Sequence, residues 1–157
     1  MTAEFERLAY EAALRSLDKQ EGSVGELRAR TSTLLAASSL AVSFLGQKAL
    51  GNPDSSALVF AALVAFVISV AASIFVLLPK RRLVFAEAGA RMYDALYEER
   101  DDMPAVYRQL AFELDRAWIS NDSKINLLHH VYTLAALASV LELLTFAALI
   151  WSNVLYS

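Results

Sequence analysis

Long apolar blocks alternate with polar blocks along this chain, and each apolar block is long enough to cross a membrane. Residues 31–50 are apolar or hydroxyl-bearing for most of their length and carry one charge, on Lys48. Residues 56–79 are uncharged and consist mainly of Ala, Val, Leu, Ile and Phe, and residues 130–151 are apolar except for Glu142. A helix of about 20 mainly apolar residues spans a bilayer. The pattern therefore predicts three transmembrane helices.

The first two apolar blocks are separated by turn-forming residues, Gly51-Asn52-Pro53-Asp54-Ser55-Ser56, which predict a tight hairpin. Basic residues near the ends of the spans predict the orientation, because they are retained on the cytoplasmic side. Every basic residue except Lys48 falls on one side of the predicted membrane. The N-terminus and residues 80–129 are therefore expected in the cytoplasm.

The polar block at residues 1–30 is expected to be helical, because its apolar residues recur at helical spacing. The predicted apolar face comprises Phe5, Leu8, Ala12, Leu14 and Leu17. Gly22 and Gly25 weaken the middle of this block and mark the expected position of a bend before the first span.

The block at residues 80–129 shows helical spacing in two segments. The first contains Phe85, Ala88, Met92 and Leu96, and the second contains Val106, Leu110, Leu114 and Trp118. Between them, Asp101-Asp102-Met103-Pro104 predicts a break and a new helix, with an Asp as N-cap and Pro104 in the first turn. No strong helix breaker follows before Trp151, so the third span is expected to continue this helix.

Composition agrees with a membrane protein that carries two polar blocks. Hydrophobic residues make up 57% of the chain, above the roughly 45–50% of an ordinary soluble domain. The mean hydropathy is +0.42 although 20% of the residues are charged, because the charges are concentrated in residues 1–30 and 80–124. We therefore predict one all-α membrane domain, residues 1–157, with three transmembrane helices and a helical cytoplasmic block.

Several function classes are not expected. The net charge of −3 argues against duplex nucleic acid as a partner. The absence of cysteine excludes disulfides, thiolate nucleophiles and Cys-type zinc sites. The sequence has no glycine-rich phosphate loop and no nucleophile elbow, and the adjacent His129 and His130 suit the membrane interface better than a metal site. We therefore expect no catalytic residues, no metal and no cofactor.

Glu142 is the most informative single residue, because it is the only acidic residue within a predicted span. It lies about 18 Å along the third span, near the middle of the bilayer. An ionised carboxylate there is costly and is expected to face protein or water, and desolvation favours the neutral form. Two interpretations stay open. Glu142 is either a buried, hydrogen-bonded structural residue or a functional residue that lines a subunit contact or a transient aqueous path.

Small residues form a stripe on each predicted span, and we expect the three stripes to meet around Glu142. They are Ser32, Ala36, Ser39, Ser43 and Gly46 on the first span, Ala62, Ala65, Ser69 and Ala72 on the second, and Ala135, Ala138, Ser139 and Thr145 on the third. Small residues let membrane helices approach closely, and hydroxyls offer hydrogen bonds to Glu142. Such faces also suit assembly into a homo-oligomer.

The basic and aromatic residues of the cytoplasmic blocks have two interpretations each. Lys80-Arg81-Arg82 is expected mainly as an anchor at the lipid headgroups. Four arginines alternate with acidic residues, which is typical of a solvated, salt-paired surface: Arg91, Arg100, Arg108 and Arg116. Four aromatic residues are expected mainly as helix–helix contacts, with base stacking as the alternative: Tyr93, Tyr97, Tyr107 and Trp118.

The order of these parts resembles a known family. Leu27-Arg28-Ala29-Arg30-Thr31-Ser32-Thr33-Leu34-Leu35-Ala36 leads into the first span, and Asn121-Asp122-Ser123-Lys124-Ile125-Asn126-Leu127-Leu128 leads into the last. Over nearly the whole chain, this arrangement is similar to the bacterial Pycsar transmembrane effectors (PycTM) and, more loosely, to SLATT-type membrane effectors. The family has a Lys-Ala pair where this chain has Arg30-Thr31.

This resemblance implies a non-enzymatic antiphage effector in the bacterial inner membrane. A companion cyclase makes a cyclic pyrimidine nucleotide, cCMP or cUMP, and the effector senses it and impairs the membrane, which causes growth arrest or cell death. The expected ligand contacts are Arg30 and Lys124, with Asn121 and Asn126 as hydrogen-bonding residues; headgroup anchoring is the alternative role of the two basic residues. A second function class also stays open, a non-catalytic accessory or scaffold subunit of a membrane assembly.

Overall fold

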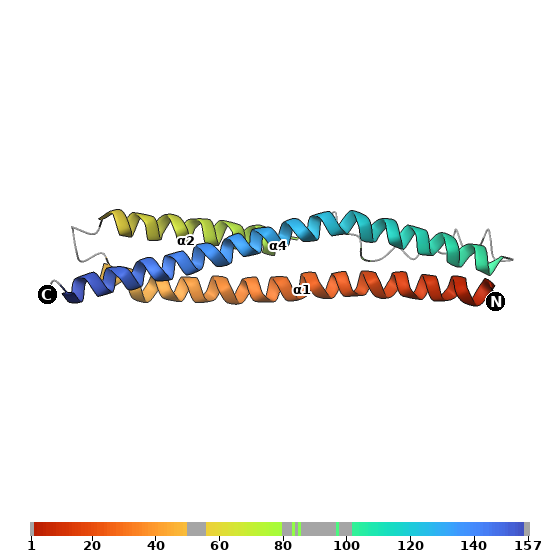
Figure 1. Cartoon of the computed structure of the whole chain (residues 1–157), viewed down its shortest axis with the longest axis horizontal. Coiled ribbons are helices and arrows are strands. Elements are labelled where there is room, and N and C mark those ends of the chain that lie inside the picture. Colours follow the sequence, from red (N-terminus) through yellow and green to blue (C-terminus); the bar gives the residue numbers. More distant parts are fainter. Residues whose placement is uncertain are drawn as a thin grey trace. The chain divides into compact units, whose positions relative to one another are not determined.

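A computed structural model describes residues 2–49, 56–79, 83, 85, 97 and 102–155, and within these ranges it contains α-helices and no strand. Helix α1 comprises Thr2–Ala49, α2 comprises Ser56–Leu77 and α4 comprises Met103–Leu155 (Figure 1). The predicted all-α class is confirmed. The expected turn at 51–55, the basic cluster at 80–82 and most of the helical segment expected at 85–96 lie outside the described residues.

Helices α1 and α4 are long and continuous. With 48 and 53 residues, they extend for about 72 and 80 Å at 1.5 Å per residue. Helix α1 passes through Gly22 and Gly25 without interruption. Helix α4 begins as predicted, because Asp102 Oδ1 accepts a hydrogen bond from the Ala105 backbone N–H at 3.2 Å and so caps the first turn.

The chain divides into two compact units. Unit 1 comprises Met1–Glu26 and Lys80–Leu127, and unit 2 comprises Leu27–Pro79 and Leu128–Ser157. Helices α1 and α4 each contribute a segment to both units, whereas α2 belongs to unit 2 alone. These divisions fall within a few residues of the borders that the sequence places between cytoplasmic and membrane segments.

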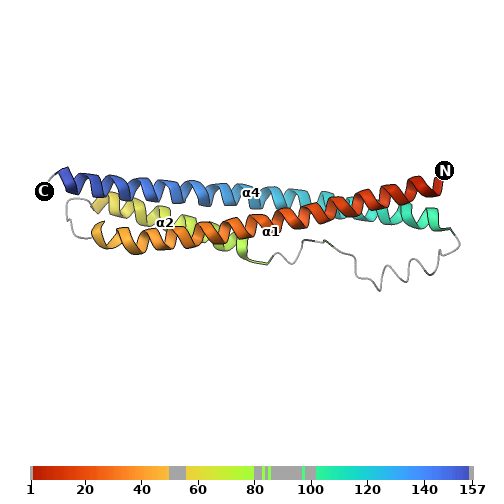
Figure 2. The ribbon, with the colours of Figure 1, turned by 90° about the horizontal axis from the view of Figure 1, so that it is seen from below.

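In unit 1, α1 and α4 lie side by side and run in the same direction (Figure 2). Large aliphatic side chains fill the space between them: Leu17, Val24, Val106, Leu110 and Leu114. The predicted apolar face of α4 is thereby confirmed at three of its positions. The face predicted for residues 5–17 of α1 is confirmed at Leu17 and is wrong at its other positions, because Phe5, Leu8, Ala12 and Leu14 are exposed. From Leu17 onward, the buried face of α1 continues through Gln20 and Val24, in steps of three and four.

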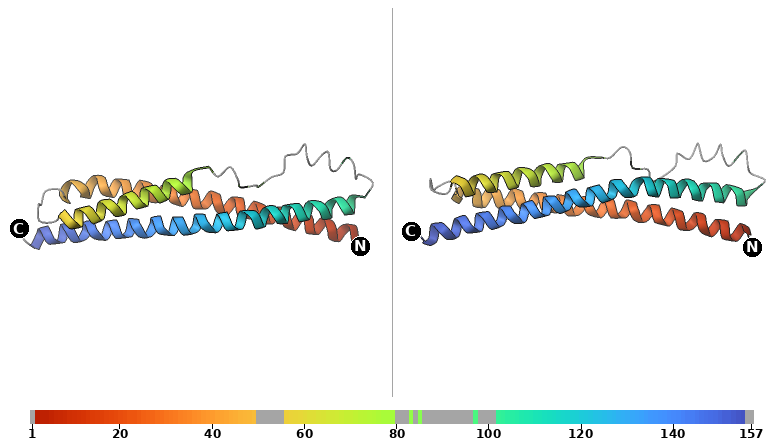
Figure 3. Two further views of the ribbon diagram at one scale, coloured as in Figure 1. Left: turned by 90° about the horizontal axis from the view of Figure 1, so that it is seen from above. Right: turned by 45° about the horizontal axis from the view of Figure 1, so that its top comes forward.

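In unit 2, α2 runs antiparallel to α1 and α4 (Figure 3). The distribution of side chains in the middle of this unit is the inverse of that in unit 1. In the middle of the unit, the interior is small or polar, with Ala65, Ala135, Ser69, Ser139 and Glu142 all buried. The outer surface carries large apolar side chains, such as Leu63, Phe60, Leu137 and Leu144. A protein in water buries its large apolar residues, so this inverted arrangement suits a surface that faces lipid.

Two apolar clusters enclose the polar interior of unit 2. One cluster contains Leu27, Val76 and Leu128, and the other contains Ala62, Phe146 and Leu149. Along α4, the segment between the clusters contains Ser139 and Glu142. The polar residues are therefore held in the middle of the three-helix unit.

The predicted small-residue stripes are confirmed on α2 and α4, whose stripe residues are buried. The stripe predicted on α1 is wrong, because Ser32, Ala36, Ser39 and Ser43 are exposed. The inward face of α1 instead presents Thr31 and Ser38. Residues 31–43 carry hydroxyl groups on both faces of the helix, so their spacing alone does not identify the buried face.

Among the described residues, two helices are long and apolar enough to cross a membrane, within Ala57–Leu77 of α2 and Met103–Ser152 of α4. Helix α1 does not meet this criterion, because Ser and Thr residues dilute its apolar half. The hydroxyls of Ser32, Thr33 and Ser39 are nonetheless satisfied, since each donates to the backbone carbonyl four residues earlier at 2.8–3.1 Å.

Candidate functional sites: a surface groove and a buried polar layer

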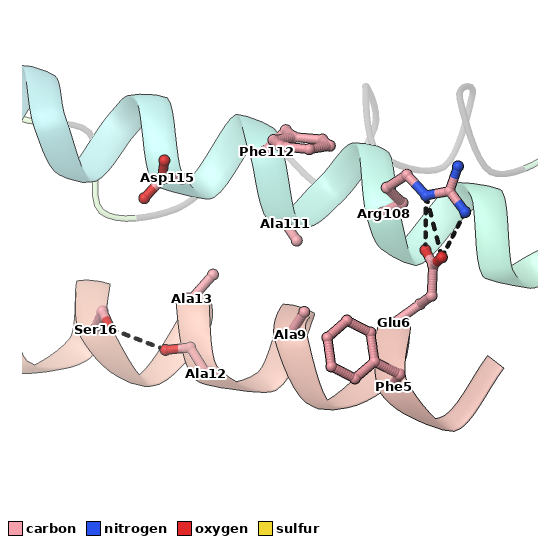
Figure 4. A pocket seen from close by; sticks show the side chains of 10 residues that line it. All are labelled: Phe5, Glu6, Ala9, Ala12, Ala13, Ser16, Arg108, Ala111, Phe112 and Asp115. Carbon is pink, nitrogen blue, oxygen red and sulfur yellow. Dashed lines mark hydrogen bonds and ion pairs between the residues drawn. The ribbon is translucent and has the colours of Figure 1, made fainter. Parts of the chain in front are cut away.

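An open groove of about 520 Å³ runs between α1 and α4 in unit 1 (Figure 4). Four alanines form its floor and walls: Ala9, Ala12, Ala13 and Ala111. These short side chains create the hollow, because nothing longer fills the space between the two helices. Phe5 and Phe112 flank the groove and are 73% and 63% exposed, so both rings are available to an incoming molecule.

An ion pair closes one end of this groove. Arg108 Nε donates to both carboxylate oxygens of Glu6 at 3.1 Å, and a second nitrogen of the guanidinium also donates to Glu6. The hydrogen bonds and the negative charge of Glu6 raise the pKa of Arg108 above its usual value. The pair confirms the predicted salt-paired surface at Arg108 and joins α1 to α4.

One face of α4 combines aromatic and basic side chains. Arg108, Phe112 and Arg116 follow one another at intervals of four residues and therefore lie on the same side of the helix. Arg108 and Phe112 line both the groove and a second hollow of about 450 Å³, which Arg116 also lines. Phe112 thus lies between Arg108 and Arg116 along α4 and lines both hollows.

This arrangement fits a ligand that has a flat ring and a phosphate. Exposed aromatic rings stack on nucleobases, and guanidinium groups donate paired hydrogen bonds to phosphate oxygens. Glu6 and Asp115 also line the groove and are able to accept hydrogen bonds from a base amino group. A phosphate at Arg108 would compete with Glu6 for the same donors.

The ligand residues expected from the sequence are divided between the two units. Arg30 is an exposed residue of unit 2, whereas Asn121, Lys124 and Asn126 belong to unit 1. Asn121 is fully buried and Asn126 is exposed, so the two amides lie on different faces of α4. Lys124 Nζ donates to Ser120 Oγ at 3.1 Å, and Asn126 Nδ2 donates to Asp122 Oδ2 at 3.0 Å. Their role in ligand binding stays a prediction.

Some aromatic residues of unit 1 make helix–helix contacts, and others are exposed. Tyr107 stacks against Tyr10, with ring centroids 5.7 Å apart, so it is a helix–helix contact as expected. Tyr97 is exposed, and Tyr93 lies outside the described residues. Phe112 was not among the predicted stacking residues, although its position midway between Arg108 and Arg116 is a recognisable signal in the sequence.

A buried polar layer is the second candidate site, and it lies within unit 2. Each helix contributes one serine: Ser38 from α1, Ser69 from α2 and Ser139 from α4. Ser38 Oγ donates to Ser139 Oγ at 2.8 Å, and Ser69 Oγ lies 2.7 Å from the same atom. Ser139 therefore joins the three helices through hydroxyl groups in an interior that excludes solvent.

Glu142 follows Ser139 by three residues and is also fully buried. Leu128, Ala135, Glu142 and Leu149 are separated by seven residues each and are all buried, as expected for one inward-facing position of a helix packed with a seven-residue repeat. Among the described residues, neither carboxylate oxygen of Glu142 has a hydrogen-bond partner. Glu142 therefore faces the interior of its own three-helix unit.

Comparison with known proteins gives no match: no family model matches this chain, and no curated protein or solved structure is significantly similar to it.

Proposed function

We propose that this chain is a bacterial membrane effector that binds a cyclic pyrimidine nucleotide through unit 1 and impairs the inner membrane through unit 2. The observation that carries the membrane part is the middle of unit 2, between its two apolar clusters, where serine, alanine and glutamate lie inside and leucines such as Leu137 and Leu144 lie outside. Such a bundle is stable in lipid, where large apolar side chains meet acyl chains and buried polar groups meet each other.

The proposal includes three membrane spans. Helices α2 and α4 are long and apolar enough to cross the bilayer. The Leu27–Ala49 part of α1 packs against both of them through Leu27, Val42 and Leu45. A helix held in this way shares their environment, and the hydroxyl groups of Ser32, Thr33 and Ser39 on its outer side are satisfied by its own backbone. The N-terminus and unit 1 are cytoplasmic, because nearly all basic residues lie on that side.

The groove of unit 1 supports the ligand part of the proposal. A cyclic nucleotide offers a flat base for Phe112 and one phosphate for Arg108 or Arg116, which matches the spacing of these residues on α4. The resemblance of the chain to the Pycsar transmembrane effectors favours cCMP or cUMP as that nucleotide. Ligand binding changes membrane integrity only if the membrane-damaging state binds the nucleotide more tightly than the resting state.

A homo-oligomer is part of the same proposal. The outer face of α1 in unit 2 carries Ser32, Ala36, Ser39 and Ser43, which are short enough to allow close approach of another helix. The outer faces of α2 and α4 carry bulky apolar residues suited to lipid. We therefore propose that copies of the chain meet through α1.

The experiment reconstitutes the purified full chain into liposomes that contain a fluorescent dye and adds cCMP or cUMP. We expect dye release with at least one of the two nucleotides. The Phe112→Ala and Arg116→Ala variants should require more nucleotide, whereas the Ile119→Ala variant, changed at an exposed residue of α4 that does not line the groove, should respond as the unaltered chain does. No release and no thermal shift with either nucleotide would exclude the proposal.

Glu142 gives a second, cellular test. We expect the Glu142→Gln variant to be expressed and inserted normally but to have lost its toxicity, because the substitution keeps the shape of the side chain and removes its charge. Unchanged toxicity would assign Glu142 a purely structural role. Purification of the chain with one stoichiometric partner protein would instead favour an accessory subunit.

A further inference from the structure

The serine hydroxyls in the buried polar layer of unit 2 can make more hydrogen bonds than the described residues provide. Three serine hydroxyls from three helices meet at Ser139, and hydroxyl oxygens engaged in such a chain retain lone pairs. Ser73 lies one turn from Ser69 on α2, and its buried Oγ has no hydrogen-bond partner among the described residues. The layer therefore presents more oxygen lone pairs and protons than its own contacts use.

Glu142 adds two more buried oxygens to this region. The side chain is 0% exposed, and both oxygens lack a hydrogen-bond partner within the described part of the chain. A buried polar atom without a partner is costly, and its presence in a folded protein commonly marks a site for an ion, a water molecule or a proton. The apolar clusters on either side exclude bulk solvent from this position.

The charges around Glu142 limit what the site can hold. The other charged or titratable side chains that the structure describes in unit 2 are Arg28 and Arg30 on α1 and His129, His130 and Tyr132 on α4. None is on α2, and each lies at least seven residues along its helix from the level of Glu142. One carboxylate neutralises one positive charge. The described residues also contain no group of three or more His, Asp or Glu suited to a metal ion, which disfavours a divalent metal.

We propose that Glu142, together with the hydroxyl oxygens of Ser139 and Ser69, binds one hard monovalent cation of the sodium type. The carboxylate supplies the balancing charge, and the hydroxyls supply neutral oxygen ligands from two helices. Oxygen donors of this kind suit small hard cations. A proton on Glu142 is the competing occupant. This inference goes beyond nucleotide sensing and does not depend on it.

The experiment uses infrared difference spectroscopy on the full chain in proteoliposomes, with choline exchanged for sodium at constant pH. We expect sodium to produce difference bands of a carboxyl group, with loss of the protonated carbonyl stretch and gain of the carboxylate stretch. The Glu142→Gln variant should lack these bands. The Ser139→Ala variant should need several-fold more sodium to reach half of the change.

Thr133→Ala is the matched control, because Thr133 is an exposed residue of α4, the helix of Ser139, and its hydroxyl donates to its own backbone at 2.9 Å. This variant should respond to sodium as the unaltered chain does. The absence of bands that depend on sodium, lithium or potassium and on Glu142 would overturn the inference. Equal sodium requirements in Ser139→Ala and Thr133→Ala would overturn the role of the serine layer. Neither result bears on whether a nucleotide causes dye release.

Discussion

Units 1 and 2 use the same two helices but distribute their side chains in opposite ways. Unit 1 buries Leu17, Leu110 and Leu114 and exposes charged residues, whereas unit 2 buries Ser139 and Glu142 and exposes leucines. The backbone is continuous through α1 and α4, so the difference comes from side chains alone. The proposal that unit 2 lies in the membrane accounts for this difference, because water favours leucine inside a bundle, whereas lipid allows small and polar residues inside.

The largest expected effect concerns the leucine core of unit 1. Leu17→Ala removes a side chain that is 1% exposed, and such a cavity costs about 2–5 kcal/mol. Hydrogen–deuterium exchange of the amides in residues 2–26 should show a loss of protection of that size. Leu14→Ala is the control, because Leu14 is 39% exposed on the same helix. Equal effects of the two substitutions would contradict the assignment of the core.

An arginine introduced on the outer surface should have different effects in the two units, and this difference should be nearly as large as the effect of Leu17→Ala. Leu137 in unit 2 and Ile119 in unit 1 both lie on α4 and are 64% and 58% exposed. Leu137→Arg should reduce membrane insertion at a cost of about 2.5–3.5 kcal/mol, whereas Ile119→Arg should change stability by at most about 0.5 kcal/mol. The inserted fraction is measured by carbonate extraction of membranes. A similar loss of the inserted fraction in both variants would contradict the proposed difference between the outer surfaces of units 1 and 2.

A larger side chain in the interior of unit 2 tests whether this interior requires small residues. Ala135 is 0% exposed, and Ala135→Leu should lower the thermal stability of the protein in detergent by about 1–3 kcal/mol. Ala148→Leu enlarges an exposed alanine of the same helix and should have little effect. If Ala135→Leu stabilised the chain, the interior of unit 2 would contain more space than the structure shows.

The smallest effect is expected from the ion pair of unit 1. Arg108 is 62% exposed as a side chain, so water and salt screen its interaction with Glu6. Glu6→Gln should therefore destabilise unit 1 by at most about 1 kcal/mol, and the loss should shrink as salt is added. Thermal unfolding at low and high salt measures both quantities. A large loss that does not depend on salt would contradict the surface character of this pair.

Features determined by neighbouring residues could be predicted from the sequence. The start of α4 follows from Asp102 and Pro104, which favour a capped first turn whatever lies nearby. The apolar stripe of Val106, Leu110 and Leu114 also faces inward as predicted, because four-residue spacing identifies one side of a helix.

Features that depend on a partner helix could not be predicted from the sequence. Residues 5–17 contain apolar side chains on more than one face of α1, and contact with α4 determines that Leu17 is buried while Phe5 and Leu8 are exposed. The groove follows from alanines on both helices that meet only after folding. The inward position of Glu142 agrees with the sequence interpretation, but the serine layer beside it required the three-helix packing.

We propose above that unit 2 lies in the bilayer and that unit 1 lies in the cytoplasm, and cysteine labelling tests this arrangement directly. The chain has no cysteine, so single cysteines can be introduced at Leu8 and Leu40, which are 54% and 59% exposed on α1. A membrane-impermeant maleimide is then added to inverted membrane vesicles and to intact spheroplasts. We expect Leu8→Cys to react in inverted vesicles only. We expect Leu40→Cys to react in neither inverted vesicles nor spheroplasts until the membrane is dissolved. Labelling of Leu40→Cys as fast as Leu8→Cys in intact vesicles would contradict this arrangement.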